Sequence, residues 1–81
     1  MSDDSTLLRE ACTAVGWSPP PGDADAITSW CLDRCKTIAG GQDREHAQNA
    51  VRGAREAARA GNLEYAVAGL RVAQQATSGG V

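Results

Sequence analysis

The sequence has no phenylalanine, a single lysine and no apolar run that approaches the roughly 18 residues of a transmembrane helix. Leucine, isoleucine and valine together number 12 of 81 residues, so few large side chains are available for a core. A chain of this length buries only about 60% of the surface that it exposes when unfolded. These shortages exclude a membrane-spanning protein and a multidomain enzyme, and we predict one small helical domain over residues 1–81.

Excess charge of one sign is lacking as well. Eight basic and ten acidic residues give a net charge of −2 at pH 7. Residues 1–41 hold six acids and three bases, whereas residues 42–81 hold four acids and five bases. This balance excludes a strongly charged tail for nucleic acid, and the net charge alone cannot attract a polyanion.

Alanine is abundant, with 15 residues, and favours closely packed helices over strands. Proline or glycine interrupts the apolar periodicity at residues 19–22, 40–41 and 61–62. We therefore predict an all-α fold, a compact bundle of four short helices whose last two form an antiparallel hairpin. The predicted helices span residues 4–15, 23–39, 43–60 and 62–76, and residues 77–81 form a flexible tail.

Local signals support these boundaries. The first helix has three candidate N-caps, Asp3, Asp4 and Ser5, and Gly40 is a stop signal for the second helix. Gly61 is predicted as a left-handed C-cap, followed by Asn62 as the next N-cap. Trp17 leads into the proline run, and we expect it to fold back over an open end of the bundle near the other tryptophan. The alternative is an exposed Trp-Ser-Pro-Pro-Pro segment that a partner reads as a polyproline helix.

The predicted helix over residues 62–76 has two apolar faces, although a surface helix needs only one. One stripe contains Leu63, Ala66, Val67, Leu70 and Ala73, and the roughly opposite stripe contains Tyr65, Ala68, Val72 and Ala76. Two interpretations follow. Either the helix is central, with neighbours on both sides, or its second face is a docking surface on which the amphipathic Tyr65 suits an interface.

Residues 50–78 resemble one helical hairpin of the tetratricopeptide type. Ala54 matches the small position of that family's first helix, Gly61-Asn62 matches its turn, and Ala66, Leu70 and Ala73 follow with the family's spacing. The family's large residues of the first helix are Ala50, Gly53 and Ala57 here. The resemblance implies a helical hairpin and, if it extends to role, binding of a protein or peptide.

Three cysteines cannot all pair within one chain, and the sequence start lacks a secretory signal, so we expect free thiols and a cytoplasmic protein. Cys31 and Cys35 fall within an apolar stripe, which favours core packing. With Cys12 and His46 they could also form a Cys₃His metal site, and the sequence leaves this open. We predict no cofactor and no catalytic site, because no nucleophile motif or carboxylate pair is recognisable.

Arg44, Arg52, Arg55 and Arg59 share one side of the predicted helix over residues 43–60. We predict a non-catalytic protein–protein interaction module, an adaptor or a small regulatory or inhibitory factor, that binds another protein or itself, without a membrane. Tyr65 and Val72 would be its apolar anchors, and Arg52, Arg55 and Arg59 its rim charges. The alternative is a small helical domain that binds nucleic acid with the arginine row.

Overall fold

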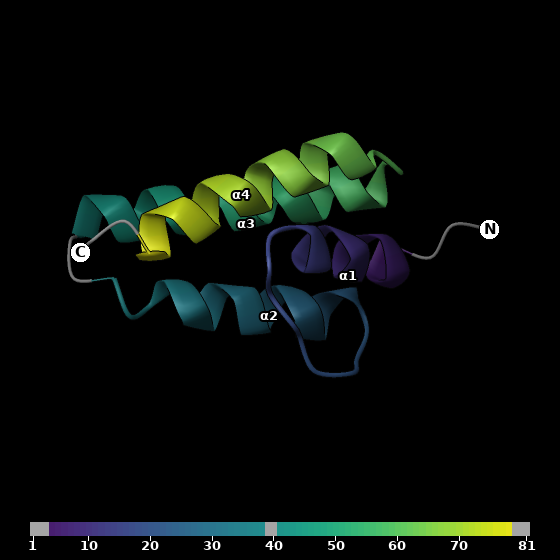
Figure 1. Ribbon diagram of the computed structural model, residues 1–81, viewed down its shortest axis with the longest axis horizontal. Coiled ribbons are helices and arrows are strands. Elements are labelled where there is room, and N and C mark those ends of the chain that lie inside the picture. The colour runs from purple at the N-terminus through teal and green to yellow at the C-terminus, as the bar shows by residue number, and fades with distance from the viewer. Residues whose placement is uncertain (1–3, 39–40, 79–81) are drawn as a thin grey trace.

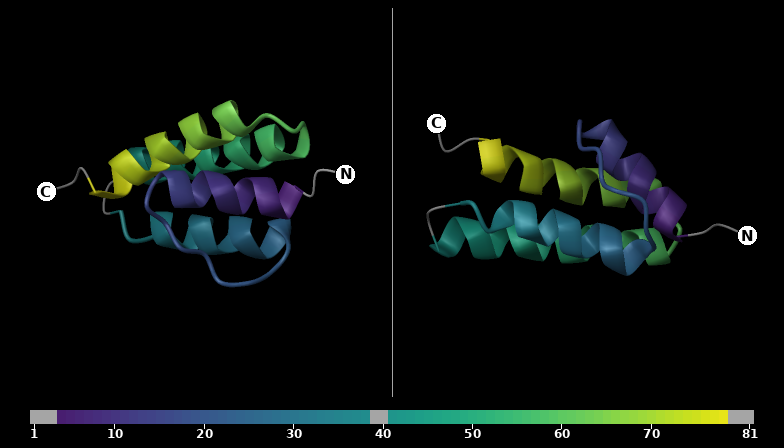
Figure 2. Two further views of the ribbon diagram at one scale, coloured as in Figure 1. Left: turned by 45° about the vertical axis from the view of Figure 1, so that its right-hand side comes forward. Right: turned by 90° about the horizontal axis from the view of Figure 1, so that it is seen from below.

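The computed structural model describes residues 4–38 and 41–78, and these form helices without any strand. In chain order the helices are α1 (Asp4–Ala14), α2 (Ala24–Cys35), α3 (Gly41–Arg59) and α4 (Leu63–Ser78). α2, α3 and α4 run along the long axis of the molecule, and α1 lies obliquely to them (Figure 1, Figure 2). The predicted all-α bundle with a C-terminal antiparallel hairpin is confirmed.

The end of α2 differs from the prediction, because this helix stops at Cys35 instead of residue 39. The Thr37 hydroxyl donates a hydrogen bond to the Arg34 carbonyl and so takes one of the free carbonyls of the last turn. The Arg44 guanidinium, from the first turns of α3, donates to the Ile38 carbonyl at 2.8 Å. The connection is therefore tied down by side chains that helical periodicity does not reveal.

The other boundaries lie close to the predicted ones. α3 begins at Gly41, two residues before its predicted start, and α4 ends at Ser78, two residues after its predicted end. The predicted cap Asp3, the predicted stop signal Gly40 and residues 79–81 of the predicted tail lie outside the described residues.

The turn between α3 and α4 is built as predicted. Gly61 has a φ of 78°, a left-handed conformation that glycine adopts without steric cost. The Asn62 N–H donates to the Ala57 carbonyl at 2.8 Å and closes the end of α3. The Asn62 side chain accepts a hydrogen bond from the Tyr65 N–H, which caps the start of α4.

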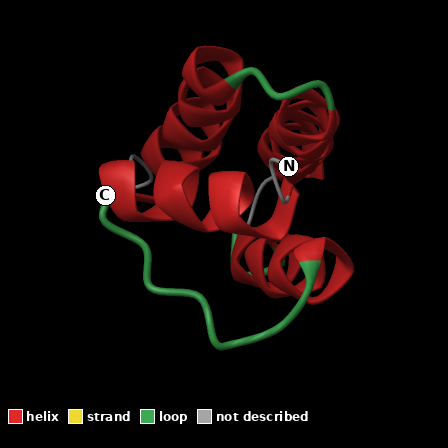
Figure 3. Cartoon of the chain, turned by 90° about the vertical axis from the view of Figure 1, so that its right-hand side faces the viewer, coloured by secondary structure: helices red, strands yellow, loops and turns green. Residues whose placement is uncertain are grey.

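The long loop between α1 and α2 extends away from the bundle (Figure 3). Hydrogen bonds from Arg9 and the burial of Trp17 attach it to the helices. Arg9 of α1 donates hydrogen bonds to the carbonyls of Pro19, Pro20 and Gly22. Trp17 is 5% exposed, so the predicted fold-back over the bundle is confirmed, and the alternative in which this tryptophan is presented to a partner is wrong.

Small side chains dominate the core. Among the described residues, seven of the fifteen buried hydrophobic side chains are alanine. α3 and α4 make the most extensive contact of any pair of helices, and Gly69 lies at their closest approach. A Cβ atom at Gly69 would stand 2.9 Å from the Ala50 carbonyl oxygen and 3.1 Å from the Ala54 Cβ. Gly53, also inside a helix, differs because a Cβ atom there would meet nothing within 4 Å.

These two glycines predict opposite responses to the same substitution. Gly69→Ala should lower the free energy of unfolding by about 1–3 kcal/mol, because the added methyl group forces α3 and α4 apart. Gly53→Ala should raise it by roughly 0.5–1 kcal/mol, because alanine favours the helix and has open space. Urea denaturation of both variants at one low protein concentration measures the difference. Equal effects of the two changes would contradict the packing described.

Candidate functional site

A groove lies between α3 and α4. α1 and α2 pack on the other face of this hairpin (Figure 1, Figure 3). The volume of the groove is about 450 Å³. We define the groove by its lining residues, which are Ala50, Gly53, Ala57 and Ala60 of α3, Asn62 of the turn, and Tyr65, Ala68, Gly69 and Val72 of α4. Carbon atoms dominate this lining, and Asn62 and Tyr65 supply its polar side-chain groups.

Helical geometry explains why the groove lies here. At 100° per residue, Ala50, Gly53 and Ala57 fall on one side of α3, next to its buried face. Tyr65 and Val72 are seven residues apart and so share one side of α4. The groove between these two rows is lined by alanine and glycine, whose small side chains leave the space above the contact between the helices open.

The groove bears exposed apolar side chains. Among the described residues, the large hydrophobic ones that stand exposed are Tyr65 at 70%, Val72 at 39% and Leu63 at 39%. All three belong to α4, and the first two line the groove. In the opposite stripe of α4, Ala66, Leu70 and Ala73 are fully covered and Val67 is half-buried, whereas Leu63 at its start is exposed. The interpretation of α4 as a central helix is therefore wrong, because one of its two apolar faces is open.

The predicted arginines do not join this groove. Arg55 reaches from α3 to α2, where its Nη2 lies 2.8 Å from Asp25 Oδ1, and its side chain is 20% exposed. Its Nε is buried without a hydrogen-bond partner. Arg52 donates to the Asn49 side chain, and Arg59 is exposed. Arg52, Arg55 and Arg59 face away from the groove, since about 150° separates them from its α3 residues around the helix.

The same arrangement divides the arginine row that the nucleic-acid alternative uses. Arg55 pairs with Asp25, and the Arg44 guanidinium bonds the Ile38 carbonyl. Two members of the row therefore tie α3 to α2 and to the connection before it, and Arg52 and Arg59 remain as its exposed members.

The three thiols lie together in the core. Cys12, Cys31 and Cys35 are all buried and free, and the Sγ atoms of Cys12 and Cys31 are 3.7 Å apart. His46 is exposed on α3. Among the described residues, no three histidine, cysteine or acidic side chains are grouped as metal ligands. Core packing of the cysteines, the interpretation that their apolar stripe favoured, is confirmed.

The environment of the thiols shifts their pKa values. The hydrogen bond with Cys12, together with burial, raises the pKa of Cys31. The same bond lowers the pKa of Cys12, against the opposing effect of burial. Burial raises the pKa of Cys35, against the opposing effect of the positive charge on Arg34.

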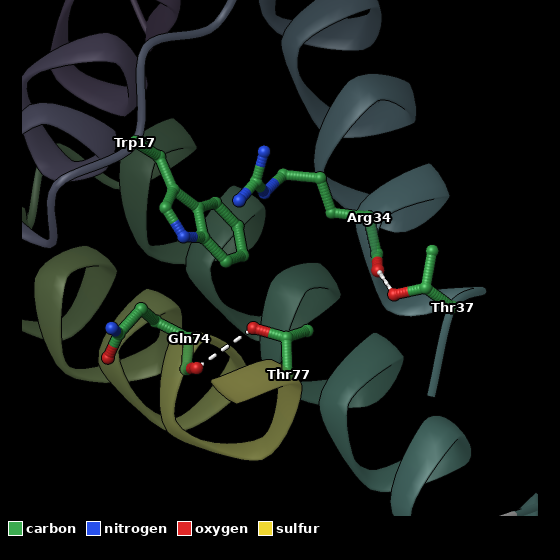
Figure 4. Close-up of a pocket in the computed structure, with 5 residues that line it drawn as sticks. All are labelled: Trp17, Arg34, Thr37, Gln74 and Thr77. Carbon is green, nitrogen blue, oxygen red and sulfur yellow. Dashed lines mark hydrogen bonds between the residues drawn. The ribbon is translucent and has the colours of Figure 1, made fainter. Parts of the chain in front are cut away.

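A second hollow, of about 320 Å³, lies at the end of the bundle (Figure 4). Trp17, Arg34, Thr37, Gln74 and Thr77 line it. The Arg34 guanidinium stacks 4.9 Å from the Trp17 ring and 5.0 Å from the Trp30 ring. The Thr37 and Thr77 hydroxyls donate to the Arg34 and Gln74 carbonyls. Both threonine hydroxyls of this hollow are thus engaged within the protein.

The sequence identified Tyr65, Ala68 and Val72 on the α4 side of the groove but not its α3 side. Gly53, Gly69 and the flanking charges Glu64 and Arg71 were not assigned a role. The available signal was spacing, because Glu64 and Arg71 are seven residues apart, as are the two anchors, and so share a side of α4.

Comparison of the chain with protein-family models, with curated proteins and with solved structures finds no match. The resemblance to a tetratricopeptide-type hairpin therefore stays a prediction. None of the described helices is both long and apolar enough to cross a membrane.

Substitution of the two exposed side chains of the groove, Tyr65 and Val72, should leave the fold intact. Tyr65→Glu or Val72→Glu should change the free energy of unfolding by less than about 1 kcal/mol, because both side chains are exposed. Leu70→Ala, on the buried side of the same helix, should cost about 2–5 kcal/mol. Circular dichroism with urea denaturation measures both. Unfolding by either glutamate would mean that the groove residues belong to the core.

Burial of Cys35 predicts a pH dependence. Its pKa is raised in the folded state, so the unfolded chain loses this proton first, near the ordinary value of about 9. The contribution of Cys35 to stability is therefore complete below that pH and is lost as the pH rises, by at most about 1.4 kcal/mol per pH unit. Urea denaturation at about pH 8 and about pH 10 should show a smaller loss for Cys35→Ala than for the unchanged protein. Equal losses would place this thiol in contact with water.

Proposed function

We propose that this chain is a non-catalytic protein–protein interaction module, an adaptor or small regulatory factor, that docks through the groove between α3 and α4. The observation that carries the proposal is the exposure of Tyr65 and Val72 beside an apolar hollow. An exposed aromatic side chain over a concave apolar surface is typical of a protein interface, where aromatic anchors contribute most of the binding energy.

The rim of the groove supports the same function. Glu64 and Arg71 are exposed on the solvent side of α4, and Asn49 and Glu56 are exposed on the solvent side of α3. A docking surface commonly has an apolar centre surrounded by polar and charged residues. This groove has that composition, with small residues along its floor.

The lining also argues for binding over catalysis. Its ionisable side chain is the Tyr65 phenol, and no carboxylate, histidine or thiol among the described residues lines the groove. General acid–base or nucleophilic chemistry needs such groups within reach of the substrate. We place the module in the cytoplasm, because its thiols are free, as is usual for proteins of a reducing compartment.

The arginines of α3 take a smaller part in this proposal than in the sequence-based one. Arg55 is committed to Asp25, so Arg52 and Arg59 are the members of the predicted rim that stay available. They lie on another side of α3, so docking through the groove does not depend on them.

The test is retention of binding partners by the immobilised protein from the cytosol of its own host, with and without nuclease. We expect a nuclease-resistant protein, a further copy of the chain included, that Val72→Glu loses. Arg52→Glu with Arg59→Glu is the matched control and should leave retention unchanged. Material that disappears with nuclease, or that only the arginine variant loses, would refute docking through the groove and favour the arginine row.

A further inference from the structure

We infer that the partner of the groove is a second copy of this chain, packed face to face about a two-fold axis that crosses α3 near Gly53 and α4 between Ala68 and Gly69. This inference rests on the proposed function and names the occupant of the same surface. In this arrangement α4 lies antiparallel to α4 of the second copy, and two hairpins make a four-helix interface.

The surface of the groove is complementary to itself. A two-fold interface uses the same patch on both copies, so the patch needs both a projection and a hollow. Tyr65 projects, being 70% exposed, and the hollow beside it has Gly53, Ala57 and Gly69 in its lining. Two-fold symmetry then lets each copy place its tyrosine in the hollow of the other, at the level of Val72 and Ala50.

The spacing of residues along α4 fits an antiparallel second copy. Tyr65 and Val72 lie equally far on either side of the Ala68–Gly69 midpoint, so an antiparallel crossing there sets each tyrosine against the valine of the second copy. The Glu64–Arg71 midpoint lies one residue earlier, so Glu64 of one copy and Arg71 of the other are about 3 Å out of register along the helix, a distance that these long side chains span.

The charges complete this pairing. Glu64 and Arg71 are both exposed, and no ion pair within the described part of the chain uses either of them. The antiparallel crossing places each glutamate beside the arginine of the second copy, so both charges are matched twice in one dimer. A foreign partner would need its own complementary charges, whereas a second copy already carries them.

Gly53 also points to a contact outside the single chain. Neither a left-handed backbone nor packing within the chain requires glycine there, since its helical conformation is ordinary and a Cβ atom would meet nothing within 4 Å. Gly69 lies against Ala50 and Ala54, and Gly53 lies between these two in the sequence. Gly53 and Gly69 are therefore at the same level along the hairpin. A close crossing of the second copy at this level accounts for a residue that otherwise weakens α3.

The area is sufficient. A standard protein interface takes about 800 Å² from each partner, and this chain has a surface of 4798 Å². About one sixth of the surface is therefore needed. The open face of a two-helix hairpin in a four-helix molecule is of that order.

The test is sedimentation velocity over a wide concentration series, with circular dichroism as the check on folding. The unchanged protein should dimerise. Glu64→Arg and Arg71→Glu should each weaken the dimer about tenfold or more, because each sets like charges together twice. An equal mixture of these two variants should recover a mixed dimer, in which both pairs have opposite charges again.

Matched controls change charge elsewhere. Glu10→Arg on α1 and Arg59→Glu on α3 alter exposed residues outside the groove and should leave the association unchanged. Gly53→Gln, which has open space in the single chain, should keep full helicity and weaken the dimer about tenfold or more.

A protein that stays monomeric at every concentration would overturn this inference, as would a dimer that the charge reversals do not weaken or that their mixture does not recover. The proposed function fails separately. A monomer that still retains a different protein through Val72 keeps the docking groove and loses the second copy as its occupant, whereas loss of all groove-dependent retention removes both.

Discussion

The approach of α3 to α4 at Gly69 is the contact on which the rest of the structure depends. A Cβ atom there would stand 2.9 Å from the Ala50 carbonyl oxygen, so the helices pack at a distance that only glycine permits. With so few large side chains, this protein stabilises its core by bringing helices close together instead of filling the space between them. The same choice of small residues leaves a groove on the outer side of the contact, so core and groove have one cause.

The end of the bundle at which α2 and α4 terminate is stabilised by different means. Trp17 and Trp30 pack edge to face, with ring centroids 6.0 Å apart, and Arg34 lies over both rings. Stacking of a guanidinium on aromatic faces is favourable and covers apolar surface at the same time. Arg9 holds the proline-containing loop through three carbonyl groups, which keeps Trp17 over the core. Arginine thus supplies contacts that larger apolar residues supply in other small domains.

The sequence was sufficient for those features that periodicity and local chemistry determine. Four helices, the left-handed Gly61, the Asn62 cap and the burial of the thiols all follow from rules that act within a few residues. It was insufficient for the arginines, because their roles depend on which helix lies opposite. Arg55 has the helical phase of a surface residue and yet meets Asp25 of α2. The two stripes of α4 were visible, but which one faces solvent is decided by where α1 and α2 pack.

Two glycines in helix interiors, Gly53 and Gly69, show how far a structure of one chain can explain its own sequence. Gly69 is accounted for inside the molecule, whereas Gly53 has no neighbour that excludes a methyl group. A glycine inside a helix lowers stability relative to alanine, so a position that gains nothing within the chain points to a requirement outside it. Gly53 lines the same groove as the exposed Tyr65 and Val72. The close approach of a second copy, as proposed above, would account for a glycine that the packing of the single chain does not explain.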